Sequence, residues 1–115
     1  MTRTNQRLAL QTKGRNMATK KKTARRIVLV RSRDSGVWMG VFRGYHGSGD
    51  VTLSSARKIW RWRGAHTTSE LALHGCVPEY SRVAEPVDTT VYGCCEMIES
   101  NEAAFAAVNA CGWAP

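Results

Sequence analysis

Residues 51–63 of the sequence are Val51-Thr-Leu-Ser-Ser-Ala-Arg-Lys-Ile-Trp-Arg-Trp-Arg63. The first four of these residues favour a short strand, and Ser55 suits the N-cap of a helix. Trp60 and Trp62, however, are two residues apart, which is the spacing of side chains on one face of a strand. We therefore expect a turn at residues 54–57 and then a second strand, with a helix as the alternative.

A period of two gives this second strand two different faces. Trp60 and Trp62 share one face, and the other face carries Arg57, Ile59, Arg61 and Arg63. We expect the tryptophan face to be core and the arginine face, with Lys58 nearby, to form a basic ribbon in solvent. The alternative is an exposed stacking platform, because guanidinium groups interleaved with indoles are typical of sites that bind bases.

The flanking segments predict hairpins and two short helices. Apolar residues 27–30 and 37–42 enclose a polar turn that ends at Gly36, and a glycine-rich turn follows at residues 44–50. Thr67 or Thr68 caps a predicted helix that stops at Gly75, and Asn101 caps an alanine-rich helix that Gly112 closes. Residues 90–98 predict a last strand. The whole predicts an α+β fold: a small antiparallel β-sheet or roll of four to five strands with two short helices.

Charge divides the chain more sharply than its formal net charge of +8 suggests. Residues 1–33 contain eleven Lys or Arg and no acid, whereas residues 64–115 contain one Arg and seven acids. We expect residues 1–24 to be a basic arm that is disordered when alone, and residues 25–115 to form one compact domain. Such an arm attracts phosphate. The expected polyanion-binding residues are Lys20, Lys21, Lys22, Arg25, Arg26, Arg57, Lys58, Arg61 and Arg63.

No motif in the sequence indicates catalysis, a metal or a cofactor. The adjacent pair Cys94 and Cys95 lacks the spacing of a zinc clamp, so we expect reduced, metal-free thiols here and at Cys76 and Cys111. The three histidines have no nucleophile or acid at a catalytic spacing. Nothing resembles a signal peptide or a membrane span, so we expect the protein in a host cytoplasm or in a virion.

Part of the sequence resembles a known protein family, which suggests where the protein comes from but not what it does. Residues 51–65 with Glu70-Leu-Ala-Leu-His-Gly75 resemble a family of small uncharacterised bacteriophage proteins, over about residues 27–98. The residues that carry the resemblance are Thr52, Leu53, Ala56, Arg57, Trp60, Trp62, Gly64, Ala65, Leu71, Ala72 and Gly75. The family has no assigned activity, so the resemblance implies a phage origin alone.

The sequence is compatible with three functions. The first is a non-enzymatic phage accessory protein that binds nucleic acid or another polyanion through the arm and the arginine face. The second is a virion component whose arm contacts neighbouring subunits, as in a homo-oligomer, or the genome. The third is an anti-defence protein that sequesters a nucleotide signal in a pocket of Trp and Arg.

Overall fold

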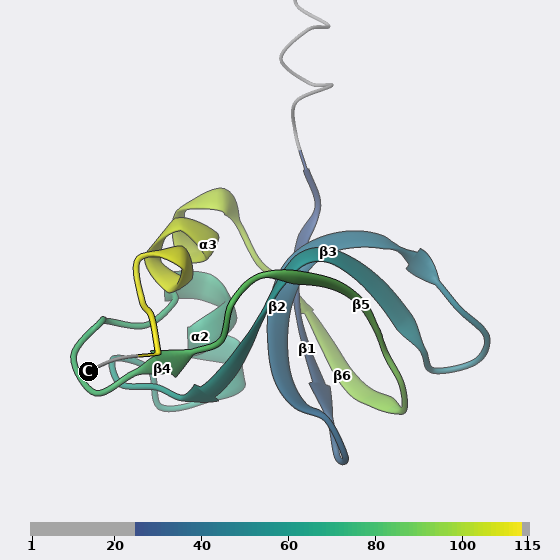
Figure 1. Cartoon of the computed structure of the whole chain (residues 1–115), viewed down its shortest axis with the longest axis horizontal. Coiled ribbons are helices and arrows are strands. Elements are labelled where there is room, and N and C mark those ends of the chain that lie inside the picture. Colours follow the sequence, from purple (N-terminus) through teal and green to yellow (C-terminus); the bar gives the residue numbers. More distant parts are fainter. Residues whose placement is uncertain (1–24, 114–115) are drawn as a thin grey trace, which may run out of the picture.

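The computed structural model describes residues 25–113, and the expectations for residues 1–24, including Lys20, Lys21 and Lys22, lie outside the described residues. The described chain contains six strands and two helices (Figure 1). In chain order the elements are β1 (Ile27–Ser32), β2 (Gly36–Tyr45), β3 (Val51–Arg61), α2 (Thr68–His74), β4 (Arg82–Val83), β5 (Val87–Val91), β6 (Cys94–Glu99) and α3 (Glu102–Asn109).

All the strands pair antiparallel in the order β4-β3-β2-β1-β6, and β5 pairs with the first half of β3. The sheet curls, because β5 and β6 belong to opposite edges and yet follow one another through the turn at Tyr92 and Gly93. The Cys94 N–H donates to the Gly49 carbonyl at 2.7 Å, which fixes this turn to the turn between β2 and β3. The result is the expected antiparallel roll, with six strands instead of four or five.

The central strand β3 is continuous where the sequence predicts a turn at residues 54–57. A β-bulge at Ser55, whose φ is 51°, inserts one extra residue against both β2 and β5. Gly40 of β2 lies opposite the bulge, and a Cβ there would stand 2.9 Å from the Ala56 Cα. The strand therefore needs a glycine on its neighbour, a long-range requirement that no local turn signal reveals.

The bulge also means that β3 contributes side chains to two different hydrophobic cores, one before and one after Ser55. Before it, Val51 and Leu53 point into the roll, where they pack with residues of β1 and β5. After it, Ile59 points to the opposite side, into a second core beneath the helices. One inserted residue inverts the facing of everything that follows, since side chains alternate with a period of two.

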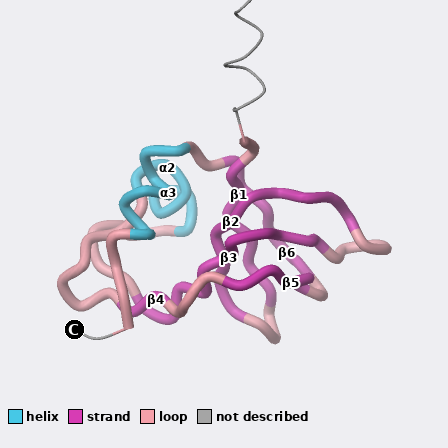
Figure 2. Tube along the Cα trace, turned by 45° about the horizontal axis from the view of Figure 1, so that its top comes forward, coloured by secondary structure: helices cyan, strands magenta, loops and turns pink. Residues whose placement is uncertain are grey.

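The two helices form where their capping residues predict. Thr67 accepts a hydrogen bond from the Glu70 N–H at 3.1 Å, and Asn101 accepts one from the Ala104 N–H at 2.7 Å. Gly75 ends α2 with a φ of 75°, and a Cβ there would lie 2.7 Å from the Ala104 carbonyl oxygen. The helices thus pack against each other at one end of the sheet, as Figure 2 shows.

The last predicted strand, at residues 90–98, is two strands in the structure. β5 ends at Val91 and β6 begins at Cys94, because Gly93 adopts a φ of 67° that turns the chain. Within residues 25–113, neither helix is long and apolar enough to cross a bilayer.

Candidate nucleic-acid interface

Arg57, expected on the solvent face, is buried, so that expectation is wrong. Only 8% of its surface is exposed, and its guanidinium donates hydrogen bonds to the Ala84 carbonyl at 2.6 Å, to Asn109 Oδ1 at 2.8 Å and to the Cys111 carbonyl at 3.3 Å. These acceptors tie β3 to the segment after β4 and to the end of α3. Arg57 therefore joins distant parts of the fold, and its burial keeps it away from a ligand at the surface.

The predicted period of two holds from Arg57 to Ile59, where the buried face is the opposite of the expected one, but the register against β4 shifts at Trp60 and interrupts the alternation. Arg57 and Ile59 do share a face, and that face lies against the helices. Trp60, expected in the core, is 57% exposed instead. Trp62 lies beyond the end of β3, is half-buried against the helix-side core and donates from its indole to the Ala65 carbonyl at 3.2 Å. The two tryptophans thus have different environments.

Long-range pairing assembles a surface around Trp60. Strand β4 pairs with the second half of β3, with Arg82 opposite Arg61. The C-terminal segment returns beside β4, where the Val83 N–H donates to the Gly112 carbonyl at 3.0 Å, and Trp113 follows (Figure 1). We call this surface the Arg–aromatic patch, and its members are Trp60, Arg61, Arg63, Tyr80, Arg82 and Trp113.

Each arginine of the patch lies over an aromatic ring. The Arg61 guanidinium is 4.1 Å from the ring centre of Tyr80 and 5.4 Å from that of Trp60. Arg63 lies 5.3 Å from Tyr80, and Arg82 lies 5.6 Å from Trp113. A guanidinium near the face of a ring is attracted to it, and its planar N–H groups can donate in pairs to an oxyanion.

The backbone around Tyr80 holds these side chains in place. Tyr80 has a φ of 72°, a left-handed conformation that is strained for a bulky residue. Its carbonyl accepts a hydrogen bond from Arg61 Nε at 2.8 Å, and its ring is 52% exposed between Arg61 and Arg63. The hydroxyl of Ser81, buried next to it, accepts from the Arg63 N–H at 3.0 Å. Strain of this kind is found preferentially at functional sites.

Ion pairs occupy a different group of arginines. Arg25 pairs with Glu102 at 2.6 Å, Arg26 with Glu99, and Arg31 with Glu96 at 3.1 Å. The hydrogen bonds from these arginines lower the pKa of Glu102 and Glu99, and bonds from Thr68 and Arg31 lower that of Glu96. Arg25 and Arg26, expected to bind a polyanion, therefore have carboxylate partners already.

The patch arginines contrast with that group. In the part of the chain that the structure describes, no carboxylate lies within ion-pair distance of Arg61, Arg63 or Arg82. Arg82 Nε is buried and lacks a hydrogen-bond partner among the same residues. Lys58, the remaining expected residue, is half-buried with its ammonium 5.6 Å from the Trp38 ring centre, outside the patch. Arg33 and Arg43 are exposed elsewhere without a carboxylate partner among the described residues, whereas Arg61, Arg63 and Arg82 gather three such guanidinium groups at the patch.

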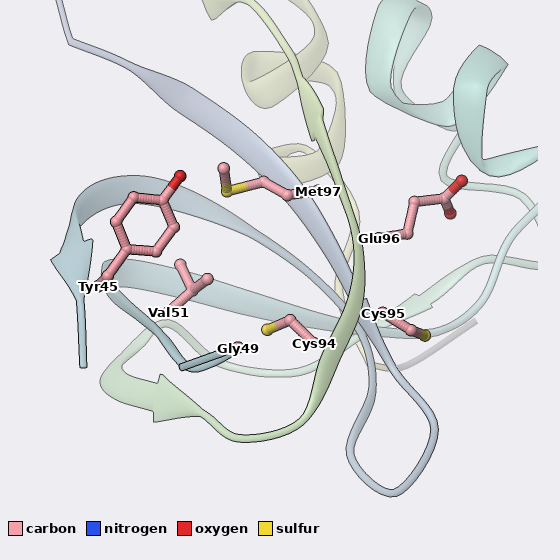
Figure 3. Close-up of a pocket in the computed structure, with 7 residues that line it drawn as sticks. All are labelled: Tyr45, Gly49, Val51, Cys94, Cys95, Glu96 and Met97. Atoms are coloured by element: carbon pink, nitrogen blue, oxygen red, sulfur yellow. The ribbon is translucent and has the colours of Figure 1, made fainter. Parts of the chain in front are cut away.

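A separate cavity of about 260 Å³ opens at the mouth of the roll (Figure 3). Tyr45, Val51, Cys94 and Met97 face it, whereas Cys95 and Glu96 point to the other side of β6. Burial raises the pKa of Cys94, which disfavours a thiolate there. The cavity is largely apolar and contains no acid–base pair, so its residues do not suggest catalysis.

The cysteines and acids show no metal centre within the described range. Residues 25–113 contain no cluster of three His, Cys, Asp or Glu side chains placed to hold an ion. Cys76 and Cys111 are both buried, with their sulfur atoms 3.6 Å apart. Burial, together with the neighbouring Cys76, raises the pKa of Cys111 to about 12.

Sequence reasoning missed three members of the patch: Tyr80, Arg82 and Trp113. Tyr80 and Arg82 flank one serine in a polar segment, and Trp113 stands alone near the C-terminus. Residues 80–82 read Tyr-Ser-Arg and do not repeat the Trp-Arg-Trp-Arg pattern of residues 60–63. No local signal therefore indicates that the two segments pair.

Comparison with known proteins identifies a family. A family model described as a domain of unknown function (DUF6948) matches residues 25–108. Because the match spans most of the chain, the protein belongs to that family. Comparisons with curated proteins and with solved structures give no match. The matched range contains every patch residue except Trp113.

Proposed function

We propose that this protein is a non-enzymatic nucleic-acid-binding protein whose Arg–aromatic patch and basic residues 1–24 contact phosphate groups. The observation that carries the proposal is the set of three guanidinium groups, Arg61, Arg63 and Arg82, that lie within 5.6 Å of the centres of exposed rings, with no carboxylate at ion-pair distance among residues 25–113. Guanidinium groups offer paired N–H donors that match the oxygens of a phosphate.

The distribution of charge over the folded residues supports the patch as the site that binds phosphate. Residues 25–113 contain ten Lys or Arg and nine Asp or Glu, so the folded part is almost neutral overall. Six of these charges cancel in the three ion pairs of Arg25, Arg26 and Arg31. The patch is therefore a local concentration of positive charge on a nearly neutral body, which favours oriented binding of an anion.

Residues 1–24 add seven Lys or Arg and no acid. Lysines and arginines that neutralise phosphates release counterions, and this release supplies affinity without sequence specificity. Lys20, Lys21 and Lys22 are the densest part of this charge. We propose that they strengthen binding to whatever strand the patch holds.

The role that we propose is that of a bacteriophage accessory protein, and its support is the sequence resemblance described above. A virion component would instead be recovered with purified particles in a fixed stoichiometry. A protein that sequesters a nucleotide signal would bind a small nucleotide as tightly as an oligonucleotide. Both are outcomes that direct measurement separates from the proposed role.

The test compares two triple variants that remove the same charge. Arg61→Gln, Arg63→Gln and Arg82→Gln together alter the patch, and Arg25→Gln, Arg26→Gln and Arg31→Gln together alter the ion-paired group. Arg57 is left unchanged in both, because its loss would disturb the fold. Binding of a labelled oligonucleotide is followed by fluorescence anisotropy at several salt concentrations.

We expect the patch variant to lose affinity and the slope of log affinity against log salt to fall by roughly 0.7 to 0.9 for each phosphate contact removed. The control variant should keep most of its affinity, since its arginines are already neutralised. Equal losses in the two variants would show that only net charge matters, and the patch would not be the site.

A further inference from the structure

We infer that the Arg–aromatic patch accepts unpaired nucleotides, with Trp60 and Trp113 stacking on bases while Arg61 and Arg82 hold the adjoining phosphates. This inference rests on the proposed function and adds to it the substrate class, single-stranded nucleic acid.

Trp60 is largely exposed to solvent. It occupies the irregular position between the pairs Ile59–Val83 and Arg61–Arg82, where the register of β3 and β4 shifts. A residue at such a position is directed away from the regular ladder. With 57% of its surface exposed, an indole has a large apolar face in water, which favours contact with a flat apolar partner.

The backbone just before Trp113 is held by hydrogen bonds. Cys111, two residues earlier, is buried, and its carbonyl accepts a hydrogen bond from Arg57 at 3.3 Å. The next carbonyl, that of Gly112, accepts from Val83 at 3.0 Å. The backbone before Trp113 is thus held by Arg57 of β3 and by Val83 of β4, while Trp113 itself remains 50% exposed.

Trp60 and Trp113 lie next to each other with their rings inclined. The ring centres of Trp60 and Trp113 are 5.6 Å apart, and their planes are inclined by 43°. Rings at this angle are not in full face-to-face contact, and with about half of each residue exposed, part of each indole remains open to a base. A wedge formed by two indoles suits a flat aromatic ligand better than a curved aliphatic one.

Each of the two indoles has an arginine side chain beside it. Arg61 lies 5.4 Å from the Trp60 ring centre, and Arg82 lies 5.6 Å from that of Trp113. Each indole therefore has a cation beside it, and each nucleotide has a phosphate beside its base. In a duplex the faces of the bases are covered by their neighbours, and only phosphates remain accessible. The exposed indoles can therefore contribute to affinity for a single strand alone.

The experiment measures the affinity of the full chain for three probes: a single-stranded oligonucleotide, a blunt duplex of the same sequence, and inorganic polyphosphate as a polyanion without bases. Deoxythymidine and uridine oligomers are compared to distinguish DNA from RNA. The variant is Trp60→Ala with Trp113→Ala, and a second variant carries Phe at both positions. Tyr92→Ala is the control, because Tyr92 is also 57% exposed but lies in the turn between β5 and β6.

We expect the wild-type protein to prefer the single strand over the duplex and over polyphosphate. The double alanine variant should lose about fivefold or more of its single-strand affinity, while its duplex affinity stays the same. The double phenylalanine variant should retain most of the preference, because Phe still stacks. Tyr92→Ala should bind as the wild type does.

The possible failures are distinct. Equal affinity for all three probes, with no effect of the tryptophan substitutions, would overturn the stacking inference but leave phosphate binding by the arginines intact. Equal loss of single-strand and duplex affinity in the double alanine variant would also overturn it, since the indoles would then act on the fold. Absence of binding to every probe would overturn the proposed function and this inference together.

Discussion

Arg57 in β3 donates a hydrogen bond from Nη1 to Oδ1 of Asn109, the last residue of α3, at 2.8 Å. The two residues are 52 positions apart in the sequence. The same guanidinium also binds the Ala84 and Cys111 carbonyls, so one side chain joins the sheet, the segment after β4 and the C-terminal helix. A buried cation of this kind is tolerated because its donors are satisfied by fixed acceptors.

We expect Arg57→Ala to lower the free energy of unfolding by about 2–4 kcal/mol, because it leaves buried carbonyl acceptors without donors. Arg57→Lys should recover little, since an ammonium cannot reproduce the planar fork. Urea denaturation measures both. Asn109→Ala, which removes only the exposed acceptor, should cost less. A loss for Arg57→Ala no larger than for Asn109→Ala would show that the buried bonds contribute little.

The two neighbouring tryptophans should respond differently to truncation. Trp62→Ala removes an indole packed against the helix-side core and should destabilise the protein by roughly 2 kcal/mol or more. Trp60→Ala removes an exposed ring and should change stability by less than about 1 kcal/mol. Thermal unfolding of the two variants under the same conditions provides the comparison. The reverse order would restore the sequence-based expectation that Trp60 is core.

Deletion of residues 1–24 should leave the cooperative unfolding transition unchanged. The two cores consist of residues between Ile27 and Cys111, so the deletion removes none of their members. Oligonucleotide affinity should fall at the same time, because seven basic residues are lost. Calorimetry and anisotropy on the same preparation measure the two effects. A broadened transition would show that residues 1–24 contribute to the folded domain.

Acid should weaken the contacts of Arg25 and Arg26. The pKa values of Glu102 and Glu99 are lowered by hydrogen bonds from these arginines, so the unfolded chain binds more protons than the folded one. The stabilisation is therefore present above the ordinary glutamate value of 4.5 and is lost as the pH falls below it. Unfolding measured between neutral pH and pH 3 should show this decline.

The double variant Glu99→Gln with Glu102→Gln should have a flatter pH profile over the same range. Glu85→Gln is the control, because Glu85 is exposed and has no ion pair among residues 25–113. High salt should reduce the difference between the double variant and the wild type, since these pairs are at the surface. Identical profiles at low salt would show that the pairs do not stabilise the fold.

The cysteines should differ strongly in reactivity towards a thiol reagent. Cys95 is exposed and should be labelled rapidly in the native protein at pH 8. Cys111 should be labelled only on unfolding, because it is buried and its pKa is raised to about 12. Peptide mass spectrometry after timed labelling distinguishes the sites, and Cys95→Ser should remove the rapid phase. Rapid native labelling of Cys111 would show that the C-terminal segment opens readily.

Features that depend on neighbouring residues could be predicted from the sequence. The hairpin of β1 and β2 follows from two apolar runs around a polar turn ending at Gly36, and the helices begin at the capping residues Thr67 and Asn101. The shared face of Arg57 and Ile59 was also predictable, because residues two apart in a regular strand lie on one face. These signals involve contacts within a few residues, where the chain has few alternatives.

Which face of β3 is buried, and which residues surround it, depends on long-range packing and could not be predicted from the sequence. The bulge at Ser55 depends on Gly40, which lies on another strand, and one extra residue reverses the facing of all that follow. For that reason Arg57 is buried and Trp60 is exposed, contrary to their hydropathy. The patch has the same origin: Tyr80, Arg82 and Trp113 reach Trp60 through the pairing of β4 and the return of the C-terminal segment. Such pairings depend on the packing of the whole chain, which a local pattern does not encode.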